Sequence, residues 1–132
     1  MTGVPSSLPL QQFMDATLDQ ICIGEFQLQF HFSTTVSPAD IQQGKFPEPR
    51  SVSVENGWEL RDGAGKVLDR YQEHSARESY SIHRLLGQHV TAFRNDPPRS
   101  FTLVFETGAA LTIFDDSFHY ESFSIQPGDI YV

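Results

Sequence analysis

Hydrophobic and polar residues alternate along several short stretches of the chain. In the clearest, residues 25–32, every second residue is apolar: Phe26, Leu28, Phe30 and Phe32, against Glu25, Gln27, Gln29 and His31. Side chains of a β-strand point alternately to opposite faces, so this pattern predicts a strand with one buried and one solvated face. Residues 101–105 repeat it. The chain is therefore expected to be mainly antiparallel β with a phenylalanine-rich core.

Further alternating stretches extend the prediction along the chain. Strands are expected over residues 20–23, 25–33, 51–55, 58–60, 67–68, 88–93, 101–106, 109–115, 119–125 and 129–132. Asn56-Gly57 separates two of these stretches and is a strong hairpin signal, because both turn positions favour a positive φ. Together with the turn at residues 62–65 it predicts a three-stranded meander. Thr107-Gly108 predicts another hairpin.

Short helices are expected beside the strands. One begins near Ser7, with apolar residues at helical spacing up to Leu18, and one spans residues 75–86, where Gly87 is a suitable stop. The long connection over residues 34–50 is expected to hold one helical turn at 37–41. We therefore predict a mainly β fold of two antiparallel sheets, packed as a sandwich or an open barrel, with one or two short helices. An α+β roll is the alternative.

The size of the chain predicts a single domain over residues 1–132. Residues 52–60 line up with residues 103–111, which suggests a duplication into two similar β-rich halves, about 1–74 and 75–132. The alternative explanation is that two hairpins resemble each other because they share turn chemistry.

Charge and targeting signals narrow the classes of function. The formal net charge is −8 and the nine Lys and Arg residues are scattered, which disfavours nucleic-acid binding and suits a basic protein partner. Cys22 is the single cysteine, so an intramolecular disulfide is excluded, and its isoleucine neighbours predict a buried, inert thiol. We find neither a signal peptide in residues 1–12 nor an apolar run of about 20 residues, so we expect a cytoplasmic protein away from membranes.

The sequence shows no catalytic or cofactor motif. The five histidines include no pair three to five residues apart, the local spacing of most zinc sites, so no metal or cofactor is expected. The Gly-x-Ser-x-Gly elbow of hydrolases and a phosphate-binding loop are both missing. These observations favour a protein without enzymatic activity.

The densest cluster of acidic and aromatic residues lies near the C-terminal end. Its candidate binding residues are Asp115, Asp116, Tyr120 and Glu121. Aromatic residues are enriched at protein interfaces, and carboxylates suit a basic partner. The alternatives are that Asp115-Asp116-Ser117 forms a turn through side-chain bonds to the backbone, and that the aromatic residues belong to the core.

Part of the chain resembles a known group of proteins. Residues 85–90, 101–108, 111–117 and 120–125 look like small bacterial β domains, some of which are immunity proteins encoded beside polymorphic toxins. The resemblance implies a bacterial protein-interaction module, such as an immunity-type inhibitor of a protein partner. Two alternatives stay open: a small-ligand-binding β barrel or enzyme whose site is assembled in three dimensions, and a homodimer that pairs through an exposed strand edge, above all residues 129–132.

Overall fold

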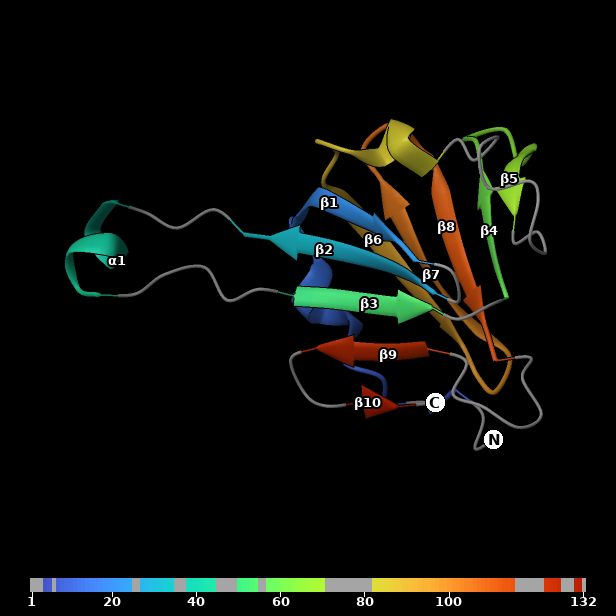
Figure 1. Cartoon of the computed structure of the whole chain (residues 1–132), viewed down its shortest axis with the longest axis horizontal. Coiled ribbons are helices and arrows are strands. Elements are labelled where there is room, and N and C mark those ends of the chain that lie inside the picture. The colour runs from blue at the N-terminus through green and yellow to red at the C-terminus, as the bar shows by residue number, and fades with distance from the viewer. Residues whose placement is uncertain are drawn as a thin grey trace.

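The protein is a β-sandwich. The computed structural model describes residues 4–5, 7–24, 27–34, 38–44, 50–54, 57–70, 82–115, 123–126 and 130–131. Within these residues, two antiparallel sheets of five strands face each other without closing into a barrel (Figure 1). The longest described helix has five residues. The predicted fold class, mainly β with two antiparallel sheets and short helices, is confirmed.

Each sheet combines strands from distant parts of the chain. Sheet A has the order β1-β2-β3-β9-β10, with β1 Thr17–Ile23, β2 Leu28–Ser33, β3 Arg50–Val54, β9 Phe123–Gln126 and β10 Ile130–Tyr131. Sheet B has the order β5-β4-β8-β7-β6, with β5 Val67–Arg70, β4 Trp58–Arg61, β8 Ala110–Phe114, β7 Ser100–Phe105 and β6 Val90–Asp96. Short helices are η1 Leu10–Phe13, α1 Pro38–Gln42 and η3 Ile82–Leu85. The helix α1 lies apart from both sheets at one end of the molecule (Figure 1).

The core lies between the two sheets and is built largely from phenylalanine, as predicted. Fully buried rings come from η1 and from both sheets: Phe13, Phe30, Phe32, Phe101, Phe105 and Phe123. The Phe32 and Phe105 rings stack across the two sheets with centroids 6.4 Å apart. Phe13 meets Phe32 edge-on at 5.2 Å, a favourable arrangement for aromatic pairs. The same rings therefore join η1, sheet A and sheet B.

The two sheets have the same strand order. Each strand of sheet A corresponds to the strand five places further along the chain in sheet B, and the count continues from β10 to β1. Sheet A contains β1-β2-β3 followed by β9-β10, and sheet B contains β6-β7-β8 followed by β4-β5. The register agrees, because Leu18 pairs with Phe32 in sheet A and Val90 with Phe105 in sheet B, each beside a shift in register. This order is what a duplication would produce. Duplication itself stays a prediction.

Backbone hydrogen bonds join the two sheets at one corner and follow the same internal relation. The Leu18 amide donates to the Gln88 carbonyl, and the Val90 amide donates to the Ala16 carbonyl, each at 2.9 Å. Leu18 in the first half corresponds to Val90 in the second, and Ala16 corresponds to Gln88. If the two halves are exchanged, each of these hydrogen bonds therefore becomes the other. This internal two-fold relation therefore matches each position of sheet A with an equivalent position of sheet B.

The structure corrects the predicted meander. β3 and β4 lie in different sheets, so the chain crosses the sandwich at Gly57 (φ 71°) and makes no hairpin there. Both strands alternate in burial, and alternation shows which residues point inward but not to which sheet a strand belongs. The aligned segments 52–60 and 103–111 are therefore not equivalent in the fold, since β7 and β8 pair within sheet B. The hairpins β4–β5 and β7–β8 are confirmed.

The predicted helices are shorter in the structure. The helix near Ser7 is reduced to the 3-10 helix η1, and the turn at residues 37–41 is confirmed as α1. Of the helix predicted over residues 75–86, only residues 82–86 are described, and the 3-10 helix η3 is found there. Residues 75–81 and the first part of the strand predicted over 119–125 lie outside the described residues.

Candidate interaction surface

The predicted acidic and aromatic patch is described only at its first residue. Asp115 follows β8, is half-buried, and its amide donates to the Arg99 carbonyl at 2.8 Å. Asp116, Tyr120 and Glu121 lie outside the described residues. The proposed binding role of these four residues therefore stays a prediction.

The described histidines lie on different elements. His31 is on β2, with Nε2 3.2 Å from the Gln29 Oε1, and His83 is exposed on η3. His89 precedes β6, with Nδ1 3.4 Å from the Glu106 Oε2. Across the residues that the structure describes, no three His, Cys, Asp or Glu side chains come close enough to hold a metal ion.

The outer face of sheet A carries two cross-strand rows of uncharged residues. The first row runs Gln20, His31, Ser51 and Gln126, and the second Cys22, Gln29, Ser53 and Ser124. We call these eight residues the neutral face. All are half-buried except Gln20, which is exposed. Cys22 was predicted to be buried; it is half-buried, because its side chain points away from the core on the outer strand of the sheet.

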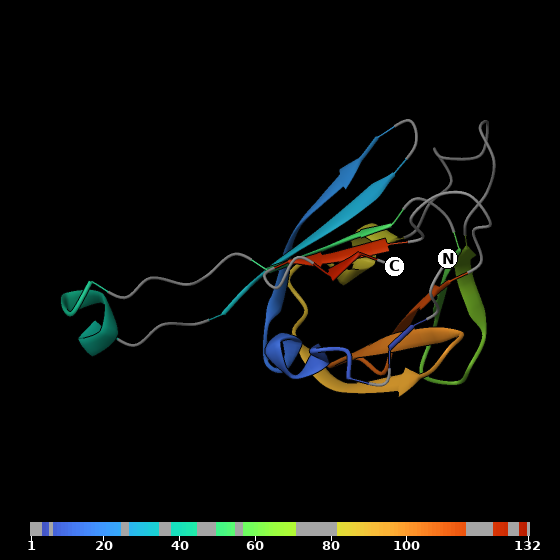
Figure 2. The ribbon, with the colours of Figure 1, turned by 90° about the horizontal axis from the view of Figure 1, so that it is seen from below.

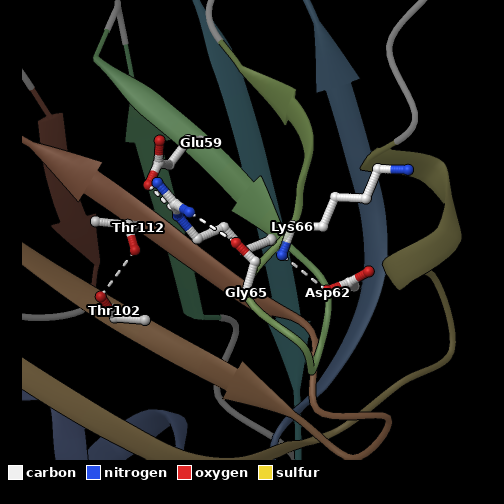
Figure 3. Close-up of polar contacts among 7 residues, drawn as sticks. Glu59, Asp62, Gly65, Lys66, Thr102 and Thr112 are labelled. Carbon is white, nitrogen blue, oxygen red and sulfur yellow. Dashed lines mark hydrogen bonds and ion pairs between the residues drawn. The ribbon is translucent and has the colours of Figure 1, made fainter.

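The equivalent positions of sheet B provide an internal comparison. They run Ala92, Val104, Ala110 and Arg61 in one row, and Arg94, Thr102, Thr112 and Glu59 in the other. Arg61 and Glu59 form an ion pair with a 2.7 Å contact, and the Thr102 and Thr112 hydroxyls lie 2.9 Å apart (Figure 3). Positions of sheet B that are equivalent to the neutral face thus accept charged residues. The requirements of the fold alone therefore do not explain why the neutral face has no charged residue.

β1 is also an edge strand of sheet A. β2 pairs with one side of β1, and on the other side the described pairing partners end at Leu18. We call Gln20–Ile23 the β1 edge; it contains neither charge nor proline. Ile23 is 54% exposed and Ile21 is half-buried. Figure 2 shows β1 and β2 projecting together beyond the rest of the sandwich.

The edge of β6 is protected by neighbouring groups. The Val4 amide donates to the Pro98 carbonyl, and the Asn95 Nδ2 donates to the Pro5 carbonyl, both at 2.9 Å. The exposed strand residue Arg94 adds a charge.

The two remaining edges have their own protection. β5 is four residues long and turns Asp69 toward the interior, and β10 has two residues. Short strands, inward charges and covering segments are the usual protection of sheet edges. No described segment covers the β1 edge, and β1 itself carries the exposed Asp19 and a shift in register between Leu18 and Gln20.

A small cavity lies between η3 and two turns of sheet B. Its volume is about 210 Å³, and its lining is mixed: Leu60, Asp62, Gly63, Leu68, Arg84, Leu85, Gln88, Thr107 and Ala109. Ligand pockets are usually about 300–1,000 Å³, so this cavity is small for a ligand. The Asp62 Oδ1 accepts the Lys66 amide (Figure 3) and also the Ala64 amide, and so shapes its own turn. This cavity therefore gives no support to the alternative that the protein binds a small ligand.

Sequence reasoning missed the neutral face and the β1 edge. The outward residues of the strand at 25–32 are visibly polar, but the rows appear only once the strand order and register are known.

In the part of the chain that the structure describes, no helix is long and apolar enough to cross a membrane. Comparison with protein-family models, with curated proteins and with solved structures gives no match for this chain.

Proposed function

We propose that this protein is a non-enzymatic interaction module that binds a basic protein partner through the neutral face. The observation that carries the proposal is that none of the eight residues of the neutral face is Asp, Glu, Lys or Arg, in a chain with net charge −8 and with charged residues at the equivalent positions of sheet B.

The chemistry of the neutral face fits the centre of a protein interface. Such centres are depleted of charged residues, because each buried charge must be desolvated. Gln and Ser side chains both donate and accept hydrogen bonds, so the face can satisfy polar groups of a partner. The acidic residues elsewhere attract a basic partner during its approach, which raises the association rate more than the affinity.

An immunity-type inhibitor is the form of this function that we favour. The resemblance to small bacterial β domains, some of them immunity proteins, supports it. Inhibition by binding requires a stable fold and a contact surface but no catalytic group. This agrees with the sequence, in which we find no catalytic motif.

The test compares two matched substitutions. Ser51→Arg places a charge at the centre of the neutral face, and Ala110→Arg places the same charge at the equivalent, similarly half-buried position of sheet B. Partners captured by the tagged protein from its host are purified, and their affinities are measured by calorimetry. We expect Ser51→Arg to weaken binding at least about tenfold, the effect of 1.4 kcal/mol, and Ala110→Arg to leave it unchanged.

Two results contradict the proposal. The first is an equal effect, or no effect, of the two substitutions on a purified partner. The second is loss of binding in Asp116→Lys or Tyr120→Ala with normal binding in Ser51→Arg, which would assign the contact to the acidic and aromatic patch instead.

A further inference from the structure

We infer that the first half of the sandwich holds a binding site for a small carboxylate anion, formed by the Arg50 guanidinium and the Gln12 side-chain amide. Such a site is separate from the proposed function, because Arg50 points into the sandwich while the neutral face lies on the opposite side of sheet A.

Arg50 lies on the inner side of sheet A, at the first residue of β3. It pairs with the buried Phe32, and two residues further along Val52 pairs with the buried Phe30. Alternate residues of a strand point to the same face, so the Arg50 side chain points inward like that of Val52. Its Nε and Nη1 are buried and have no hydrogen-bond partner in the part of the chain that the structure describes. As a residue Arg50 is half-buried, so the site lies at the margin of the core.

The buried guanidinium requires an anion. An arginine side chain does not lose its proton in proteins, so Arg50 stays charged at any physiological pH. Removing this charge from water is unfavourable unless a negative charge and hydrogen-bond acceptors replace the water. The ion pairs found between described residues involve Arg61 and His89, and Arg50 takes part in neither. A bound anion would supply both the charge and the acceptors.

The internal two-fold relation shows that the fold does not need an arginine at this position. Ser51 of sheet A corresponds to Ala110 of sheet B, so Arg50 corresponds to Ala109. Ala109 is buried, and its carbonyl accepts the Phe105 amide at 2.8 Å, which continues the pairing of β7 with β8. The sandwich is therefore complete with an alanine at the equivalent position. A buried cation in its place points to a role in binding.

A second unpaired donor lies in the same place. The Gln12 Nε2 is buried and, among the described residues, also lacks a hydrogen-bond partner. Gln12 is the third residue of η1 and corresponds to Arg84, the third residue of η3. Arg84 and Ala109 line one cavity in the second half. Gln12 and Arg50, which take their places, therefore lie close together in the first half. In Figures 1 and 2, η1 lies at the end of the sandwich where β3 begins.

The groups of the site favour a carboxylate with a single charge. One guanidinium balances one negative charge, its planar donors match two carboxylate oxygens, and the Gln12 amide adds a further donor. Phe13 adjoins Gln12 and Phe32 pairs with Arg50, so their rings, 5.2 Å apart, bring apolar surface to the site. A sulfate or phosphate dianion would leave one negative charge unbalanced there, which is unfavourable in a buried place.

Binding of carboxylate probes tests the inference. Acetate and benzoate are titrated into the purified full chain by calorimetry near neutral pH, with sulfate and chloride compared at equal ionic strength. We expect one carboxylate to bind per chain, at least about tenfold tighter than sulfate, and Arg50→Met to weaken this binding at least about tenfold. Arg94→Met is the matched control, because Arg94 is exposed on β6, and it should bind normally. Failure of both carboxylates to bind, tighter binding of sulfate, or equal binding by Arg50→Met would overturn the inference.

The free energy of unfolding, measured in urea, separates a binding arginine from a structural one. In chloride alone, Arg50→Met should be at least as stable as the native chain, because it removes a buried charge without a partner. Saturating carboxylate should stabilise the native chain and leave Arg50→Met unchanged, since a ligand stabilises only the folded state that binds it. Arg50→Ala repeats the comparison with the residue that the second half has at this position. If both variants lose stability in chloride, the arginine has a structural role and the inferred site is wrong.

Discussion

At the scale of single residues, the internal two-fold relation exposes a difference at Asp15 and Gly87. Both have a positive φ, 61° and 85°, and each amide donates to the other half, Asp15 to the Val90 carbonyl and Gly87 to the Leu18 carbonyl. The left-handed conformation costs an ordinary residue roughly 1–2 kcal/mol, and Asp tolerates it better than most. The same backbone requirement is thus met by two different residues.

This comparison yields a prediction for Gly87. A Cβ atom at Gly87 would meet nothing within 4 Å, so a substitution there tests the backbone conformation alone. We expect Gly87→Ala to lower the free energy of unfolding by about 1–2 kcal/mol, and Gly87→Asp by less. Urea denaturation measures both. An equal loss in the two variants would show that the side chain of Asp15 has no part in tolerating its φ.

At the scale of elements, the buried hydroxyl pair of Thr102 and Thr112 fixes β7 against β8. The two residues are 2% and 9% exposed, so neither hydroxyl has ready access to water if its partner is removed. We expect Thr102→Val to destabilise the protein by about 1–2 kcal/mol, because it leaves the other hydroxyl buried and unpaired. The double replacement by valine should cost less than the sum of the two single ones. Additive losses in a double-mutant cycle by urea denaturation would rule out the coupling.

The sequence predicts where most strands lie along the chain, but it does not predict to which sheet a strand belongs. Alternation predicts the strands around Phe30 and Leu103 well, because burial of one face leaves a period of two in any sheet. It could not place β3 and β4 in different sheets, since a residue pattern records inward direction and not the neighbouring strand. The hairpin predicted from Asn56-Gly57 was wrong for a related reason. A residue pair that suits a tight turn also suits a connection that crosses from one sheet to the other.

The candidate surface shows the same limit. That Gln29 and His31 are solvated follows from the sequence, because they alternate with buried residues. That they lie beside Ser51 and Ser53 depends on the pairing of β2 with β3. The pairing of β3 with β9, about 70 residues further along the chain, then adds Ser124. Such non-local pairings leave no periodic signal within one segment. The neutral face therefore becomes visible only in the folded chain.

At the scale of the whole molecule, each half depends on the other. The central strand of sheet A, β3, lies between β2 of the first half and β9 of the second, and β8 lies between β7 and β4 in the same way. A half on its own would expose three-stranded and two-stranded pieces with unpaired edges and an uncovered apolar face. An isolated two-stranded piece is marginally stable at best, and the three-stranded piece would lose the sheet that covers its apolar face.

Cutting the chain into its predicted halves tests this dependence. We expect residues 1–74 and 75–132, produced separately, to lack a cooperative thermal transition, because neither can complete a sheet or cover its buried phenylalanines. Mixed in equal amounts, they should assemble one to one and recover the circular dichroism of the intact chain, since the pairs β3–β9 and β4–β8 need no covalent link between the halves. Stable folding of either half alone would show that the strands shared between the sheets are not what holds the sandwich together.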